Sequence, residues 1–315
     1  MAHWLGIDLG ATNTKVAVVS DEDWTIRHQG QAPTDRRSPQ HTVRACAELA
    51  RRWVDDIGDV AGVGCTLPGV FDADGMPLVV ANLPGDWRGV GVREPLSEAT
   101  GLPTTLINDA RAFGLAESRL GAARGLDDVI GMTLGTGIGG AVVLGGELYV
   151  GRAGNAGELG HQVLLPDGPP CGCGNRGCLE ALARADAVAL AAGHPTVAAA
   201  AEAARRGDDQ ARAALAEAGR WIGLGLANLV TVLTPQAVVV GGGVAQAGEL
   251  LLEPLRRRLR ECTPLVAPET YQVLLAELGP LAGAVGAAVA ASDAQRHRDA
   301  QRPRDAQVRA YLSAD

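Results

Sequence analysis

The sequence has few aromatic residues and almost no lysine. Phe, Trp and Tyr make up 3% of the 315 residues, so the hydrophobic core must consist of Val, Leu, Ile and Ala. The 42 glycines are available for turns and for close approaches of the backbone. Lys15 is the only lysine, and arginine carries the other positive charges. The formal net charge of −8 argues against a general nucleic-acid-binding protein, because such a protein needs a basic surface.

Long uninterrupted apolar segments are also missing. No segment reaches the roughly 18 apolar residues of a membrane-spanning helix, and the start, MAHWLGIDLG, lacks the features of a secretory signal peptide. The six cysteines of a chain without an export signal indicate reduced thiols or a metal site rather than a disulfide framework. We therefore expect a cytoplasmic protein with neither a membrane nor a nucleic-acid partner.

The length and the order of apolar segments indicate more than one domain. A chain of 315 residues exceeds one ordinary core, and strand-like segments alternate with helical ones, which is typical of an α/β protein. A strand–turn–strand pattern occurs around DLGATNTK and again around LGTGIGGA, as in a duplicated nucleotide-binding architecture. The end of the chain, 293–315, carries a six-residue repeat of Asp-Ala-Gln without an apolar stripe. It is expected to form a solvated or frayed extension.

The first glycine-rich turn, in DLGATNTK, is a candidate phosphate-binding site. Asp8 lies at the end of a predicted strand, and Gly10 and Thr12 belong to a tight turn whose backbone N–H groups can approach phosphate oxygens. The Asp8 carboxylate could hold a water molecule or Mg²⁺ beside those phosphates. The alternative is an ordinary hairpin turn that requires small residues, because short glycine-rich matches are common by chance.

Two further glycine-rich segments strengthen the phosphate-binding interpretation. LGTGIGG (134–140) is not a Walker A loop, because no Lys-Ser or Lys-Thr pair follows, and it is not a dinucleotide fingerprint, because a strand follows it. VVVGGGV (238–244) is a buried strand that ends in three glycines and could form the floor of a nucleotide-base site. Its alternative is an ordinary βα turn. Together the three segments favour phosphate binding.

The segment INDARAF carries a candidate catalytic acid. Asn108 and Asp109 follow a predicted strand, and a carboxylate at that position can accept a proton from a substrate hydroxyl that attacks a phosphoryl group. Asp109 could also be the N-cap of the helix that begins at Ala110, and the spacing alone favours this use. The two roles are compatible.

Three cysteines within CGCGNRGC follow a nearby histidine. His161, Cys171, Cys173 and Cys178 form a Cys₃His set, which is typical of a structural zinc site. The alternative, three free thiols in a surface loop, would be prone to oxidation. A metal there would fix Glu158, His161 and Glu180 relative to one another, and such a group suits a polyhydroxylated ligand. Alternatively, the two glutamates are solvated surface acids.

The motifs occur in an order that resembles a known family. The chain resembles the ROK family of repressors, open reading frames and kinases, through DLGATNTK, NLPGDW, INDA, LGTGIGG, GELGH, CGCGNRGCLE and VVVGGG, which extend from about Leu5 to Val289. The resemblance implies a two-domain α/β fold of the actin-like (ribonuclease H-like) sugar kinase type, with ATP and sugar in an interdomain cleft. It implies a smaller domain of residues 1–109, completed by a helix around 281–292, and a larger domain of residues 110–280 with the zinc loop, followed by the polar tail.

The resemblance also implies roles for individual residues. Asp109 would be the general base. The expected sugar-binding residues are Gly69, Asn82, Asn108, Asp109, Glu158, His161 and Glu180. The expected residues for ATP and Mg²⁺ are Asp8, Gly10, Thr12, Lys15, Gly135, Thr136, Gly137, Gly241, Gly242 and Gly243. The expected ligands of the structural Zn²⁺ are His161, Cys171, Cys173 and Cys178.

The resulting prediction is an ATP-dependent sugar kinase, most simply a glucokinase that forms glucose 6-phosphate. A kinase for N-acetylmannosamine, fructose or allose uses the same chemistry and stays an alternative. A sugar-responsive repressor is disfavoured, because the first phosphate-loop strand begins by Leu5 and leaves no room for a DNA-reading domain. A zinc-dependent binding module without catalysis is disfavoured by the presence of Asp109. The resemblance favours a homodimer or homotetramer.

Overall fold

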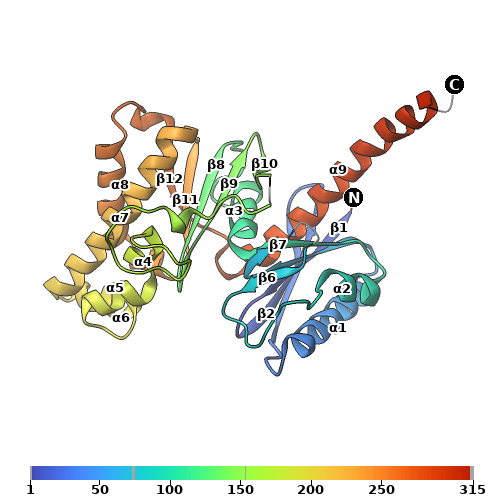
Figure 1. The fold of residues 1–315 in the computed structure, drawn as a ribbon, viewed down its shortest axis with the longest axis horizontal. Coiled ribbons are helices and arrows are strands. Elements are labelled where there is room, and N and C mark those ends of the chain that lie inside the picture. The colour runs from blue at the N-terminus through green and yellow to red at the C-terminus, as the bar shows by residue number, and fades with distance from the viewer. Residues whose placement is uncertain (1, 73–74, 153, 313–315) are drawn as a thin grey trace. The chain divides into compact units, whose positions relative to one another are not determined.

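The computed structural model describes residues 2–72, 75–152 and 154–312, with side-chain surroundings up to residue 300. The chain forms two compact units: unit 1 contains Met1–Ala112 and Leu281–Asp315, and unit 2 contains Phe113–Pro280. The chain passes from unit 1 to unit 2 inside helix α3 (Asp109–Arg119), and it returns just before helix α9 (Ala282–Leu312) (Figure 1).

Unit 1 is built on a mixed sheet with the strand order β3-β2-β1-β4-β7. Strand β2 pairs antiparallel with β1 and β3, whereas β4 pairs parallel with β1 and β7. The central strand β1 is largely buried along its length, as expected for a strand that helices α1 and α9 contact. The sheet strands are β1 (His3–Leu9), β2 (Asn13–Ser20), β3 (Ile26–Pro33), β4 (Val60–Leu67) and β7 (Thr104–Asn108). A separate hairpin consists of β5 (Gly69–Phe71) and β6 (Pro77–Val80).

Helices α1 (Pro39–Ile57) and α2 (Arg93–Thr100) pack against each other in unit 1. Helix α1 begins after Ser38, whose hydroxyl accepts the backbone N–H of His41, and it ends at Gly58 with a positive φ of 77°. The apolar sides of both helices join the sheet side chains in one core. Local capping and apolar burial therefore agree on where α1 lies.

Helix α9 contacts β1, β2, β4 and β7, and it lies unusually close to the strands. A Cβ atom on Gly6 of β1 would lie 1.8 Å from the carbonyl oxygen of Ala284, and one on Gly64 of β4 would lie 1.8 Å from that of Ala287. Only glycine fits at these two strand positions, because the helix backbone occupies the space of a side chain. The Ala- and Gly-rich start of α9 therefore completes unit 1.

Helix α9 does not stop near residue 292, where a helix was expected to end and a frayed extension to begin. It continues through the Asp-Ala-Gln repeat to Leu312. The repeat contains good helix formers, Ala, Gln and Arg, and pairs side chains one turn apart, such as Asp293 with Arg296 at 3.8 Å. The guanidinium of Arg296 also lies 5.2 Å from the ring centre of Trp24, which holds this part of the helix on unit 1.

Unit 2 contains a second mixed sheet with the strand order β10-β9-β8-β11-β12. Its strands are β8 (Val129–Leu134), β9 (Ile138–Leu144), β10 (Glu147–Leu148), β11 (Ala237–Gly241) and β12 (Gln272–Leu275). Its α-helices after α3 are α4 (Leu179–Ala183), α5 (Ala185–Ala192), α6 (Val197–Arg205), α7 (Asp209–Leu233) and α8 (Glu249–Cys262). Short 3₁₀ helices are η1 (Leu159–His161), η2 (Val244–Ala247), η3 (Pro268–Thr270) and η4 (Gly279–Leu281). Helices α7 and α8 pack closely and, with the sheet, enclose the unit 2 core.

The two sheets follow the same plan. In each, an antiparallel β-turn-β pair (β1–β2 or β8–β9) is followed by parallel strands on the side of its first member. The repeated architecture expected from DLGATNTK and LGTGIGGA is therefore confirmed. Among the described helices, none combines the length and apolar character required to cross a membrane.

Candidate functional site

The first turn lies between β1 and β2 of unit 1. The carboxylate of Asp8, which precedes this turn, is held by Thr66 and Lys15. The hydroxyl of the buried Thr66 donates to Asp8 Oδ1 at 2.8 Å, and the same Thr66 oxygen accepts the backbone N–H of Leu9 at 3.2 Å. Lys15 Nζ lies 3.4 Å from Asp8 Oδ2. A Cβ atom on Gly283 would lie 2.6 Å from Asp8 Cγ, so the first turn of α9 packs against this carboxylate. Asp8 is therefore held in one orientation beside the turn.

The turn backbone is fixed by Thr34. Its hydroxyl donates to the carbonyl oxygen of Gly10 at 2.7 Å, and its N–H donates to the carbonyl oxygen of Thr12 at 2.9 Å. The side chain of Thr12 is exposed. Because Thr34 holds the carbonyl side of the turn, the loop that is expected to receive phosphate has a defined conformation.

Asn108 and Asp109 stand where β7 ends and α3 begins. Asn108 Oδ1 accepts the N–H groups of Ala110 at 3.0 Å and Arg111 at 3.2 Å, so Asn108 is the residue that caps α3. The N–H of Ala110 also lies 2.9 Å from Asp109 Oδ1. Asp109 is exposed, in the first turn of the helix. Since Asn108 serves as the cap, the capping alternative for Asp109 loses most of its support.

Gly69 and Asn82 lie in the same unit as Asp109. Asn108 Nδ2 donates to the carbonyl oxygen of Gly69 at 3.0 Å, which joins β7 to the β5–β6 hairpin. Gly69 has a φ of 139°, and a Cβ atom there would lie 1.9 Å from the carbonyl oxygen of Val79. Asn82 follows β6, is exposed, and has a left-handed φ of 64°. The structure therefore links Asn108 to Gly69 directly, and among the residues that it describes no hydrogen bond joins Asn82 to either of them.

The second turn, residues 135–138 between β8 and β9, is held by residues around α4. Glu180 Oε2 accepts the backbone N–H of Ile138 at 2.9 Å, and the N–H of Ala185 donates to the carbonyl oxygen of Gly135 at 2.9 Å. A Cβ atom on Gly137 would lie 2.6 Å from Glu180 Oε2, so a larger residue there would have to displace the Glu180 carboxylate. Glu180 was expected to bind sugar, and its contact with this turn was not predicted from the sequence.

The third glycine-rich segment follows β11. Gly242 has a φ of 90°, and a Cβ atom there would lie 2.3 Å from the carbonyl oxygen of Leu134, the last residue of β8. A Cβ atom on Gly241 would lie 2.6 Å from the Phe113 ring, whereas Gly243 has open space around its Cα. The segment therefore packs against the end of β8, from which the second turn departs.

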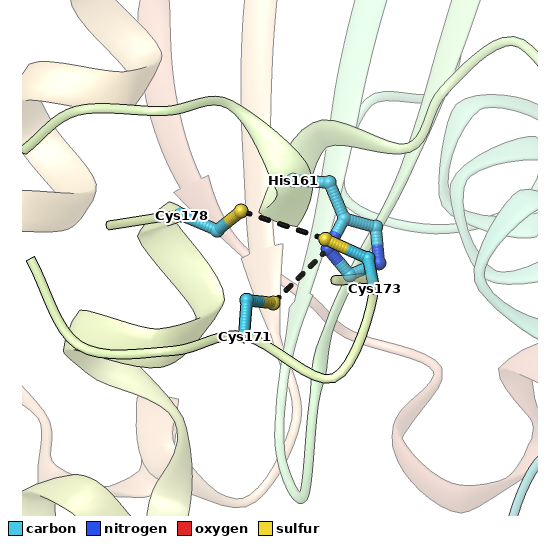
Figure 2. A group of neighbouring side chains, drawn as sticks. All are labelled: His161, Cys171, Cys173 and Cys178. Atoms are coloured by element: carbon cyan, nitrogen blue, oxygen red, sulfur yellow. Dashed lines mark hydrogen bonds between the residues drawn. The ribbon is translucent and has the colours of Figure 1, made fainter. Parts of the chain in front are cut away.

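His161, Cys171, Cys173 and Cys178 come together in unit 2 and point toward one another (Figure 2). Their potential ligand atoms all lie within 4.8 Å of one another. Cys171 Sγ is 3.6 Å from His161 Nδ1, and Cys173 Sγ is 3.7 Å from Cys178 Sγ. A tetrahedral zinc ion with bond lengths of about 2.3 Å to sulfur and about 2.0 Å to nitrogen gives S···S and S···N separations of about 3.8 and 3.5 Å. The four residues therefore fit a metal ion of this kind.

The local backbone explains how these ligands converge. The N–H of Cys171 donates to the carbonyl oxygen of Asn175 at 2.8 Å, and Gly174 has a φ of 94° in the resulting turn. Gly177 has a φ of 65°, and a Cβ atom there would lie 1.5 Å from the carbonyl oxygen of Leu165. Glycine is favoured at both positions, which accounts for two of the three glycines of CGCGNRGC.

The three thiols differ in their surroundings. Cys173 is exposed, and the backbone N–H of Asn175 helps to lower its pKa. Cys171 and Cys178 are buried, and burial raises the pKa of both thiols, for Cys178 to about 12. Without a metal, Cys171 and Cys178 are therefore ordinary neutral thiols, and a metal ion would have to displace their protons.

The predicted site residues fall into one group in each unit. Unit 1 contains Asp8, Gly10, Thr12, Lys15, Gly69, Asn82, Asn108 and Asp109. Unit 2 contains Gly135, Thr136, Gly137, Glu158, His161, Cys171, Cys173, Cys178, Glu180, Gly241, Gly242 and Gly243. Thr66 and Gly283, which contact the Asp8 carboxylate, were missed, because neither belongs to a motif and both are far from Asp8 in the sequence.

Comparison with known proteins gives consistent relatives over nearly the whole chain. The family model of the ROK family matches residues 4–294. A glucokinase from Thermotoga maritima is 36% identical over 311 residues, which cover 90% of this chain and 95% of that protein. The structure of a ROK hexokinase from Thermus thermophilus superposes with a TM-score of 0.85 at 37% identity, covering 94% of this chain and 99% of the other.

A second solved structure carries ligands. The ROK glucokinase from Streptomyces griseus, in complex with glucose and AMPPNP, superposes with a TM-score of 0.76 at 36% identity, covering 93% of this chain and all of the other. These similarities confirm the α/β sugar kinase fold that the motifs predicted. The chain belongs to the ROK family.

Proposed function

We propose that this protein transfers the γ-phosphoryl group of ATP to the 6-hydroxyl group of glucose. The main support is its similarity, over about nine-tenths of the chain, to the glucokinases of Thermotoga maritima and Streptomyces griseus, the latter in complex with glucose and AMPPNP. The motifs alone would leave the sugar open, whereas these relatives favour glucose over N-acetylmannosamine, fructose or allose. ATP is the phosphoryl donor in this proposal.

Asp109 is proposed as the general base. It is exposed in the first turn of α3, and Asn108 supplies the cap, so the carboxylate can accept a proton from the sugar hydroxyl. Asn108 and Gly69 would hold the sugar from unit 1, and Asn82, Glu158, His161 and Glu180 are the remaining proposed sugar contacts. Two of these, Asn108 and Glu180, already accept backbone N–H groups, which fixes their orientation.

The phosphates are proposed to bind at the turns of the two β-turn-β units, with Lys15 beside the first turn. Gly241 to Gly243 are proposed to lie near the adenosine. Asp8 presents a partly exposed carboxylate, and carboxylate oxygens are among the ligands that Mg²⁺ prefers. When bound there, Mg²⁺ would supply charge neutralisation for the phosphate oxygens. The turns themselves would hold the phosphates through backbone N–H groups.

His161, Cys171, Cys173 and Cys178 are proposed to bind a structural Zn²⁺. The observed separations of 3.6 and 3.7 Å match the edges of a zinc tetrahedron. Four protein ligands leave no open position for substrate, so the ion would supply folding energy to the 161–178 loop and no catalytic water. The cytoplasmic location and the homodimer or homotetramer stay predictions.

The test measures ADP release with Mg-ATP against glucose, mannose, N-acetylmannosamine, N-acetylglucosamine, fructose and allose at equal concentrations. The highest kcat/KM with glucose supports the proposal. A higher value with another sugar keeps the kinase and replaces glucose as its substrate. Binding of sugar without turnover of any member contradicts the proposed enzyme and favours a sugar sensor. Parallel assays with polyphosphate in place of ATP test the choice of donor.

A further inference from the structure

The phosphate turn 135–138 and the metal-ligand group of unit 2 are packed against each other. Helix α4 begins directly after Cys178, and two contacts join this region to the turn: Glu180 Oε2 with the N–H of Ile138, and the N–H of Ala185 with the carbonyl oxygen of Gly135. The first contact holds the N–H of Ile138, the first residue of β9, and the second holds the carbonyl oxygen of Gly135, which directly follows β8. The positions of α4 and of the first residue of α5 therefore restrict the conformation of the turn.

The segment that carries His161 contacts the same turn from the short helix η1. A Cβ atom on Gly160 would lie 2.1 Å from the carbonyl oxygen of Ile138, and one on Gly140 would lie 2.2 Å from Leu159 Cγ. The backbone of Gly160 and the side chain of Leu159 are thus closely packed against β9, so a displacement of η1 would displace the start of β9. Both pieces of chain that supply metal ligands thus contact residues 135–140.

Glu180 touches both features with one carboxylate group. Its Oε1 lies 3.8 Å from Cys171 Sγ, a proposed metal ligand, while its Oε2 accepts the Ile138 N–H. Glu180 is also only two residues from Cys178 in the sequence. An ion bound by Cys171 and Cys178 would therefore restrict the movement of Glu180 both through its contact with Cys171 and through the backbone. This side chain is expected to bind sugar, but within the protein it contacts Cys171 and the phosphate turn.

We propose that Glu180 is a positioning residue that couples metal binding to nucleotide binding. It does so by holding the turn at residues 135–138 in its phosphate-binding conformation. A turn that binds phosphate through backbone N–H groups must have those groups aligned before the ligand arrives, because ordering them during binding reduces the affinity. The metal would fix the positions of α4 and η1. Glu180, which lies in α4, would then hold the Ile138 N–H in a fixed position. The inference rests on the proposed function, in which this turn receives ATP phosphates.

The first measurement is the affinity for Mg-AMPPNP, by calorimetry, of metal-loaded and chelator-treated protein. Glu180→Ala should weaken binding of the loaded protein about tenfold or more, because one hydrogen bond to a charged group is lost. Metal removal should weaken wild type by a similar factor and should add little to Glu180→Ala. Glu180→Gln keeps an oxygen that can accept the Ile138 N–H, so it should restore most of the affinity. Glu158→Gln is the matched control, expected to weaken sugar binding and leave AMPPNP affinity unchanged.

The second measurement does not depend on catalysis or on nucleotide binding. Amide hydrogen exchange of residues 135–140 should become faster on metal removal and in Glu180→Ala, and should stay near the wild-type rate in Glu180→Gln. Unchanged exchange and unchanged AMPPNP affinity after metal removal, with sugar affinity reduced, would overturn the inference and leave Glu180 as a sugar contact. If wild type fails to bind AMPPNP, the proposed function fails, and the exchange rates still decide whether metal and turn are coupled.

Discussion

Glu117, near the end of α3, is completely buried and accepts three backbone N–H groups. Its Oε2 accepts the N–H of Ala122 at 2.9 Å and that of Glu277 at 3.1 Å, and its Oε1 accepts the N–H of Leu278 at 2.9 Å. Residues 277 and 278 directly precede the point at which the chain leaves unit 2. One carboxylate therefore fastens α3 to the returning segment.

The cost of replacing Glu117 follows from this count of acceptors. Glu117→Ala removes the acceptor of three partly buried N–H groups, and each lost hydrogen bond to a charged group costs about 1.5–3 kcal/mol. Water that enters the vacated space offsets part of the sum, so we expect a loss of about 4 kcal/mol. In Glu117→Gln the amide oxygen can replace Oε2 and keep two bonds, while its NH₂ faces the Leu278 N–H. We expect that variant to lose about 2 kcal/mol.

The assay is equilibrium urea unfolding, followed by far-ultraviolet circular dichroism. Tryptophan fluorescence is less suitable, because Trp221 is the only one of the five tryptophans that lies in unit 2. Thr263→Val is the matched control: this buried hydroxyl of unit 2 donates to the carbonyl oxygen of Leu259 at 2.9 Å, and its loss should cost about 1 kcal/mol. A Glu117→Ala protein no less stable than Thr263→Val, with an unchanged m-value, would refute the reasoning.

Three further predictions concern single side chains. Asp109→Asn should lower kcat with glucose by about 10²–10⁴-fold at nearly unchanged sugar affinity; near-normal kcat would reject the base, and Glu94→Gln, exposed in the first turn of α2, is the control with wild-type kcat. Cys173→Ser should reduce bound zinc and weaken sugar binding, whereas full zinc occupancy by elemental analysis would contradict the Cys₃His set. Asp208→Ala should lower Tm at neutral pH, because its carboxylate caps α7 through the N–H of Ala211, which also lowers its pKa. A carboxyl group whose pKa is lowered in the folded protein stabilises the fold at pH values above its ordinary pKa of 3.8, and this stabilisation is lost as the pH falls. The Tm difference between Asp208→Ala and wild type should therefore shrink on acidification, and a constant difference would contradict the prediction.

The features that the sequence predicted well are those whose chemistry lies within a short stretch. CGCGNRGC combines ligands with the glycines that its turns need, and the structure brings Cys171, Cys173 and Cys178 together with His161. The β-turn-β units could be found for the same reason, because each strand pairs with its immediate neighbour in sequence. Local geometry is sufficient to predict such features.

Glu117 and Thr66 could not be found in this way. Glu117 bonds to an amide 161 positions away, and Thr66 bonds to a carboxylate 58 positions away. No spacing rule connects such pairs, since they become neighbours only after β4 lies beside β1 and the chain returns from β12 to α9. The continuation of α9 beyond residue 292 was not predicted for a different reason: the repeat lacks an apolar stripe, and helix propensity and side-chain pairing favour the helix there instead.

Glu117 and Glu180 use their carboxylates for the same purpose. Neither bonds to a basic side chain in the contacts described above; each accepts backbone N–H groups at a place where the chain changes direction. A carboxylate that binds amides fixes a loop without a second long side chain, so the loop can stay rich in glycine. Glycine-rich turns are flexible on their own, yet phosphate binding requires an ordered backbone. An acidic side chain that binds backbone amides can supply this order to a flexible turn. Removing Glu180 should therefore lower the nucleotide affinity more than the stability of the fold, whereas removing Glu117 should lower the stability more than the nucleotide affinity.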